Sequence, residues 1–98
     1  MMNKTSRAPI GAVGRQILDK LALAFPDAEL MLEDQSHLHA GHAGARPGGE
    51  SHFKLDAVAP AFAGKSRIER HRMINSVLKD ELSGPVHALA IVARAPGE

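Results

Sequence analysis

The spacing of apolar residues along this chain of 98 residues changes from a helical period to strand alternation and back. Between residues 9 and 25 they recur every three or four positions, which predicts an amphipathic helix. Pro9 suits the first position of that helix, and Pro26 ends it. The next stretch, AELMLED at residues 28–34, alternates apolar and polar side chains and therefore predicts a strand.

The rest of the chain predicts three further main elements. SHFKLDAV at residues 51–58 alternates again, which indicates a second strand, and PAFAGK is a turn or short helix. S-R-I-E at 66–69 is a capping box that opens a helix, and S-G-P at 83–85 ends it. VHALAIVA at 86–93 is a third strand, whose nearly continuous apolar character favours burial on both faces. The order α-β-β-(short α)-α-β predicts an α+β domain with helices on one face of a three-stranded sheet.

Composition and charge limit the classes of protein that this chain can belong to. Apolar residues make up 44% of the sequence, a globular value, and the length fits one small domain. No apolar run approaches the roughly 20 residues of a membrane span, and MMNKTSRAPIGA lacks the apolar region of a secretory signal. We therefore expect a cytoplasmic protein without a membrane partner, with residues 1–8 a flexible N-terminus, 9–94 the domain and 95–98 a tail.

A segment rich in histidine and glycine separates the first two predicted strands. Gln35–Glu50 contains three histidines, four glycines and no periodicity, so it predicts a long loop. Loops of this length in compact domains are usually functional or disordered. Imidazole is a common metal ligand, and the chain has no cysteine, so histidine, carboxylate or a partner must hold any metal. The segment alone is compatible with both a zinc-binding loop and a solvated loop.

Basic residues gather around the start of the second predicted helix, although the net charge of the chain is only +1. They are Lys65, Arg67, Arg70, Arg72 and Lys79. A helix N-terminus also favours anions, so these residues could contact nucleic-acid phosphates. The sequence has no Tyr or Trp on which bases could stack. A solvated basic face, or a face that docks a protein partner, explains the pattern equally well.

Four segments of the sequence are typical of a known family: SHLHAGH, ESHFKL, FAGKSRIERHRMINSVLKDEL and PVHALAI. In order and spacing they resemble the BolA family over roughly residues 10–93. The resemblance implies a class II KH-like fold, α-β-β-α-α-β, in agreement with the element order above. It also implies two possible roles, partnership with monothiol glutaredoxins through a shared [2Fe–2S] cluster and DNA binding in transcription regulation.

The resemblance also implies which residues would hold that cluster. In the family, a histidine of an H-A-L motif and a histidine or cysteine of the loop between the first two strands are ligands. Here the H-A-L residue is His87, the loop candidates are His39 and His42, and His52 is a third candidate. A chain without cysteine can offer only imidazoles, so the glutaredoxin cysteine and glutathione would supply the thiolates.

The favoured prediction is therefore a non-enzymatic protein, monomeric alone and heterodimeric with glutaredoxin. A DNA-binding regulator that uses the basic helix, and a zinc-binding loop protein, are the alternatives.

Overall fold

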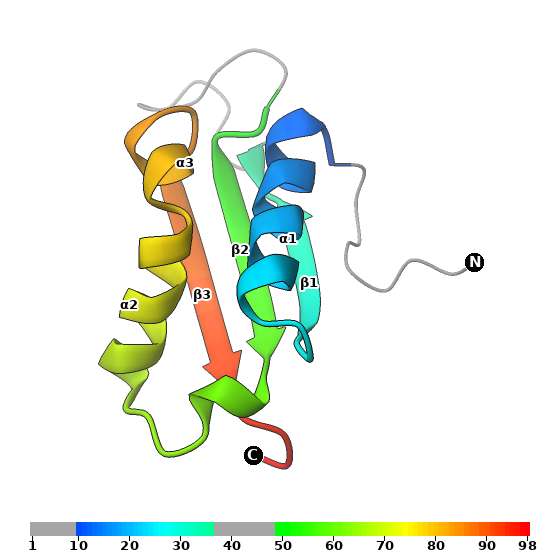
Figure 1. Cartoon of the computed structure of the whole chain (residues 1–98). Coiled ribbons are helices and arrows are strands. Elements are labelled where there is room, and N and C mark those ends of the chain that lie inside the picture. The colour runs from blue at the N-terminus through cyan, green and yellow to red at the C-terminus, as the bar shows by residue number, and fades with distance from the viewer. Residues whose placement is uncertain (1–9, 37–48) are drawn as a thin grey trace, which may run out of the picture.

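The structure, a computed structural model, describes residues 10–36 and 49–98. Its elements follow the predicted order (Figure 1): α1 (Ala12–Ala24), β1 (Glu29–Asp34), β2 (His52–Val58), the short 3-10 helix η2 (Pro60–Phe62), α2 (Arg67–Val77), α3 (Lys79–Ser83) and β3 (Ala88–Arg94). The expected flexible stretch 1–8 and Pro9 lie outside the described residues. Within the described part of the chain, no helix is long and apolar enough to cross a membrane.

The three strands form one mixed sheet in the order β1-β2-β3. β1 is antiparallel to β2, whereas β3 is parallel to it. A parallel neighbour requires a crossover, and the segment containing η2, α2 and α3 provides it. Figure 1 shows α1 and α2 lying over the same face of the sheet. The predicted α+β architecture, a three-stranded mixed sheet with helices on one face, is therefore confirmed.

The hydrophobic core fills the layer between this sheet and its helices. In β1, Leu30 and Leu32 are buried while Met31 is exposed, as the alternation predicted. The sheet contributes Phe53 and Leu55 from β2. The helical and connecting segments contribute Ile17, Leu21, Phe25, Phe62, Ile74 and Leu78, among others.

β3 corrects one prediction. Its residues alternate between exposed and half-buried, so the expected burial on both faces is wrong. Leu89 and Ile91 pack against the core, whereas Ala88 and Ala90 are exposed and Val92 is 40% exposed on the opposite face. β3 is an edge strand, with β2 as its neighbour on one side. Two of its four exposed positions are alanine, whose small side chain costs little to leave in water, so an apolar run did not require a second covering layer.

The long second helix that the sequence predicted is divided at Leu78. This residue leaves the regular helical conformation, with φ −102° and ψ 21°, and α3 begins at the next residue. The capping box is present: Ser66 Oγ accepts the N–H of Glu69 at 3.1 Å, and a carboxylate oxygen of Glu69 accepts the N–H of Ser66 at 2.7 Å. The S-G-P stop also holds, because α3 ends at Ser83.

Residues 95–98, expected as a tail, pack against the domain. Ala95 is buried, and the Glu98 carboxylate forms a bidentate pair with the Arg70 guanidinium on α2, with nitrogen–oxygen distances of 2.6 and 2.8 Å. Arg70 also donates to the carbonyl oxygens of Lys65 and Ala93. One arginine thus joins the start of α2, the end of β3 and the segment after it.

This pair predicts an acid-sensitive contribution to stability. The hydrogen bond from Arg70, with a second from the N–H of Ala95, lowers the pKa of Glu98 to about 2 from an ordinary 4.5. Because the folded-state pKa is lowered, the contribution is present above pH 4.5 and is lost as the pH falls toward 2. Chemical-shift titration should give a Glu98 midpoint near 2, and Arg70→Gln should move it back toward 4.5. An unchanged midpoint in that variant would contradict the pairing.

Candidate functional site

The fold brings together two of the predicted ligands, His52 and His87. His52 opens β2, and His87 immediately precedes β3; because these strands are parallel neighbours, both residues lie at the same end of the sheet (Figure 1). Their ring centroids are 5.2 Å apart and their planes are tilted by 47°. His52 is 6% exposed, whereas His87 is exposed. The other two candidates, His39 and His42, lie outside the described residues.

Ser51, which directly precedes β2, forms hydrogen bonds with both residues of this histidine pair. Its backbone carbonyl accepts the N–H groups of His87 at 2.7 Å and Ala88 at 3.1 Å. Its hydroxyl oxygen lies 2.8 Å from Nδ1 of His52. Ser51 itself is fully buried, so one residue fixes the backbone that carries His87 and contacts the ring of His52.

Further hydrogen bonds join the segment before residues 37–48 to the segment after them, next to the histidine pair. Ser36 Oγ accepts the N–H groups of Ser51 at 2.9 Å and His52 at 3.1 Å. The Asp34 carboxylate accepts the N–H of Ser36 with one oxygen at 2.9 Å and the N–H of Glu50 with the other at 3.0 Å. We call Asp34, Ser36, Glu50 and Ser51 the polar clasp. Sequence reasoning missed Ser36 and Ser51.

Glu50 connects the clasp to α1. Its backbone lies in the left-handed region, with φ +62°, which is uncommon for a residue other than glycine. Its carboxylate accepts the N–H of Gly14 at 2.9 Å in the first turn of α1, where the N-cap Gly11 provides no side chain. A Cβ at Gly11 would collide with that carboxylate, so the glycine leaves room for it. A negative charge at a helix N-terminus is favourable. The bond between Gly14 and the Glu50 carboxylate also connects α1 to the histidine end of the sheet.

The described donors in this region are too few to form a complete metal site among themselves. Among residues 10–36 and 49–98, no cluster of three or more His, Cys, Asp or Glu side chains could hold a metal ion. Structural zinc and iron–sulfur clusters normally take four protein ligands. The described pair offers two imidazoles, so the remaining ligands would have to come from outside the described residues. The exposure of His87 leaves it accessible to a second molecule.

The predicted nucleic-acid residues lie mainly elsewhere. Figure 1 places the start of α2 at the end of the domain opposite the starts of β2 and β3. Lys65, Arg67, Arg72 and Lys79 are exposed. The Arg70 side chain is only 12% exposed and is paired with Glu98. Four of the five predicted basic side chains are therefore exposed.

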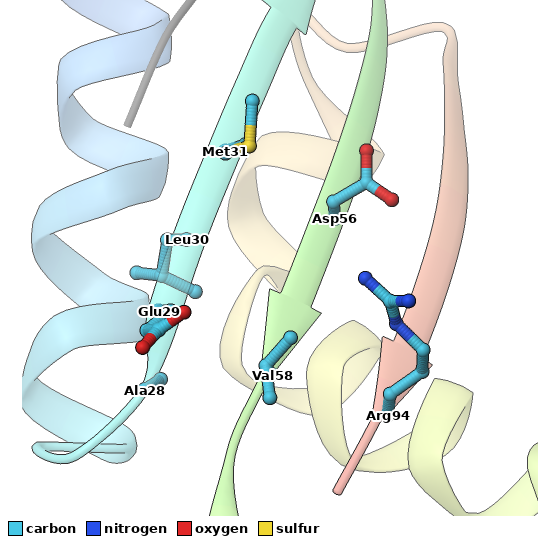
Figure 2. A pocket seen from close by; sticks show the side chains of 7 residues that line it. All are labelled: Ala28, Glu29, Leu30, Met31, Asp56, Val58 and Arg94. Carbon is cyan, nitrogen blue, oxygen red and sulfur yellow. The ribbon is translucent and has the colours of Figure 1, made fainter. Parts of the chain in front are cut away.

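A hollow of about 460 Å³ is lined by residues from the start of β1 and from the ends of β2 and β3 (Figure 2). Figure 2 shows the side chains of Asp56 and Arg94 directed toward one another there, with Met31 and Val58 nearby. Among the predicted site residues that the structure describes, none lines this hollow. It is separate from the histidine pair, which is at the other end of the strands.

Comparison with known proteins identifies the fold and then the family. The BolA domain of SufE1 from Arabidopsis thaliana has the same fold, with a TM-score of 0.80 at 45% identity, covering 90% of this chain and 96% of that one. BolA1 from Mus musculus gives a TM-score of 0.74 at 35% identity, covering 98% of this chain and 75% of that chain. The family model for BolA-like protein matches residues 21–98. The chain belongs to the BolA-like family.

Curated relatives agree with this assignment. SufE-like protein 1, chloroplastic/mitochondrial, from Arabidopsis thaliana is 46% identical over 93 residues, which is 91% of this chain and 25% of that protein. BolA-like protein 1 from Homo sapiens is 44% identical over 89 residues, 91% of this chain and 62% of that protein. The chain thus spans a quarter of the first relative and less than two thirds of the second.

Proposed function

We propose that this chain is a non-catalytic partner of a monothiol glutaredoxin and shares a [2Fe–2S] cluster with it. His87 and a second imidazole would come from this chain, and the glutaredoxin cysteine and glutathione would supply the thiolates. The observation that carries the proposal is an exposed imidazole, His87, whose backbone is fixed beside a second imidazole by the carbonyl of Ser51. Membership of the BolA-like family supports it.

The donor set also has chemical consequences. When bound, a cluster with two imidazole and two thiolate ligands has a higher reduction potential than one with four thiolates. The imidazoles must be deprotonated to bind, so acid weakens their hold on it. These properties suit regulation or transfer better than permanent storage.

The test is anaerobic reconstitution of the chain with a monothiol glutaredoxin and glutathione, followed by visible absorption and circular dichroism. We expect a spectrum that differs from that of glutaredoxin alone, because imidazoles replace two of its cluster ligands. His87→Ala should abolish the difference. His71→Ala, at a half-buried histidine on α2, is the matched control and should retain it.

Two outcomes would contradict the proposal. Either wild-type chain leaves the glutaredoxin spectrum unchanged, or His87→Ala gives the same spectrum as wild type. In both cases salt-dependent DNA binding by Lys65, Arg67 and Arg72 becomes the next function to test.

A further inference from the structure

One side of β3 has no neighbouring strand among the residues that the structure describes. The hydrogen bonds at the end of β3 show which backbone groups face this free side. The Arg94 carbonyl points toward β2, because it accepts the N–H of Ala59 at 2.9 Å. In a trans peptide the carbonyl and the following N–H point in opposite directions, so the N–H of Ala95 faces the free side. Successive residues of a strand bond to alternate sides, so the Ala93 carbonyl also faces it.

Both of these backbone groups are bound by the ion pair between Arg70 and Glu98, which we call the edge pair. A guanidinium N–H of Arg70 donates to the Ala93 carbonyl at 3.1 Å. A carboxylate oxygen of Glu98 accepts the N–H of Ala95 at 3.0 Å. One residue of an added parallel strand would make the same two bonds with its own N–H and carbonyl. The edge pair therefore occupies the place of a fourth strand at this end of β3.

The rest of the free side of β3 lacks the features that usually protect an edge strand. By the same alternation, Leu89 and Ile91 direct their backbone N–H and carbonyl groups toward it. The exposed side chains of Ala88, Ala90 and Val92 carry no charge. Charged side chains discourage an edge strand from pairing with another chain, and three of the six residues of β1, the opposite edge, are acidic. β3 has the edge pair in their place.

We propose that the edge pair closes a strand-addition site on β3, and that the partner it excludes is β3 of a second copy of this chain. In antiparallel pairing about a two-fold axis at Val92, Ile91 of one copy exchanges hydrogen bonds with Ala93 of the other. Leu89 pairs with Ala95 in the same way. These bonds require the Ala93 carbonyl and the Ala95 N–H, which the edge pair holds. Strand pairing and the edge pair are therefore mutually exclusive.

The side chains of β3 also suit a second copy as the partner. The same axis places Val92, which is 40% exposed, against its counterpart, and Arg94 of one copy opposite Ala90 of the other. Directly opposed like charges would destabilise the pairing, and this arrangement contains none. The edge pair is thus the feature that keeps the folded chain monomeric.

Sedimentation velocity over a range of chain concentrations tests the proposal. Glu98→Ala frees the N–H of Ala95 and releases Arg70, so each copy regains backbone groups for pairing. We expect this variant to form a dimer with a dissociation constant at least about tenfold lower than that of wild type. Asp27→Ala removes the same charge at an exposed position outside β3 and should behave like wild type.

Substitutions at the exposed Ala90 test which surface the dimer uses. In the Glu98→Ala background, Ala90→Lys places a lysine opposite Arg94 of the other copy and should abolish association. Ala90→Glu places an opposite charge there and should strengthen it. The amides of Leu89 and Ile91 should also exchange more slowly as the concentration of Glu98→Ala rises.

Two outcomes would overturn the proposal. In the first, Glu98→Ala remains as monomeric as wild type, so the edge pair excludes nothing. In the second, the Ala90→Lys and Ala90→Glu variants associate equally. Association through unfolded chains or through another surface would not depend on the sign of this charge, so equal association would show that β3 does not pair.

Discussion

Replacing Lys20 by methionine is expected to lower the free energy of unfolding, because it removes the counter-charge of a buried carboxylate. Glu81 on α3 is 2% exposed, and one of its oxygens accepts from Lys20 at 2.8 Å and from Gln16 at 2.6 Å, both on α1. Its other oxygen is buried without a hydrogen-bond partner among the described residues. The Lys20 side chain is 33% exposed, so solvent weakens the pair and moderates the loss.

The pH dependence of this loss distinguishes charge from packing. Burial alone would raise the pKa of Glu81, but the hydrogen bond and charge of Lys20 and the donor from Gln16 outweigh it and lower the pKa. In wild type the contribution of Glu81 is therefore present above its ordinary pKa and is lost as the pH falls. In Lys20→Met burial should dominate and raise that pKa, so acid should favour the folded variant. The difference in stability between the two proteins should shrink on acidification.

Urea unfolding of both proteins, from neutral pH to pH about 4, measures this difference. Lys79→Met makes the same substitution at an exposed lysine of α3 and should change stability by less than about 0.5 kcal/mol. If Lys20→Met lost the same stability at every pH, lost packing of the lysine stem would explain the effect. The ion pair would then contribute nothing measurable.

Most of the fold could be predicted because its signals are local. The capping box, the S-G-P stop and the alternation of Leu30 and Leu32 with Met31 each act within a few residues, and the structure has all three. The prediction that β3 is buried on both faces was wrong, because burial depends on what covers the sheet and no local sequence pattern contains that information. The break at Leu78 is equally hidden, since its backbone N–H still bonds to Ile74 and its side chain stays buried.

The candidate site was less predictable because long-range pairing assembles it. His52 and His87 were both identified as candidates, but their contact arises from the parallel register of β2 and β3, in which His52 pairs with Ala88. Glu81 in K-D-E-L has the local pattern of a solvated helix end; only the docking of α1 buries it against Lys20. Ser36 gave no signal, since the backbone groups that its hydroxyl oxygen binds are fifteen or more residues away.

Replacing Asp34 by alanine is expected to cost about 2 to 3 kcal/mol and to loosen the histidine end of the sheet. The carboxylate accepts two backbone N–H groups, from Ser36 and Glu50, and hydrogen bonds to charged groups contribute about 1.5–3 kcal/mol each. Asp34 is partly exposed, so water replaces some of what is lost. Asp34→Asn retains one acceptor oxygen and should cost about half as much.

Hydrogen exchange checks where the effect of Asp34→Ala falls. The amides of Ser36 and Glu50 lose their acceptors and should exchange faster, followed by those of Ser51 and His52, which Ser36 Oγ accepts. Amides in the centre of β2 should change only by the global loss of stability. Asp27→Ala, in the exposed turn before β1, is the control and should leave the site unchanged. If Asp34→Ala accelerated exchange evenly over the whole sheet, the carboxylate would stabilise the domain as a whole and would have no specific part in holding the histidine pair.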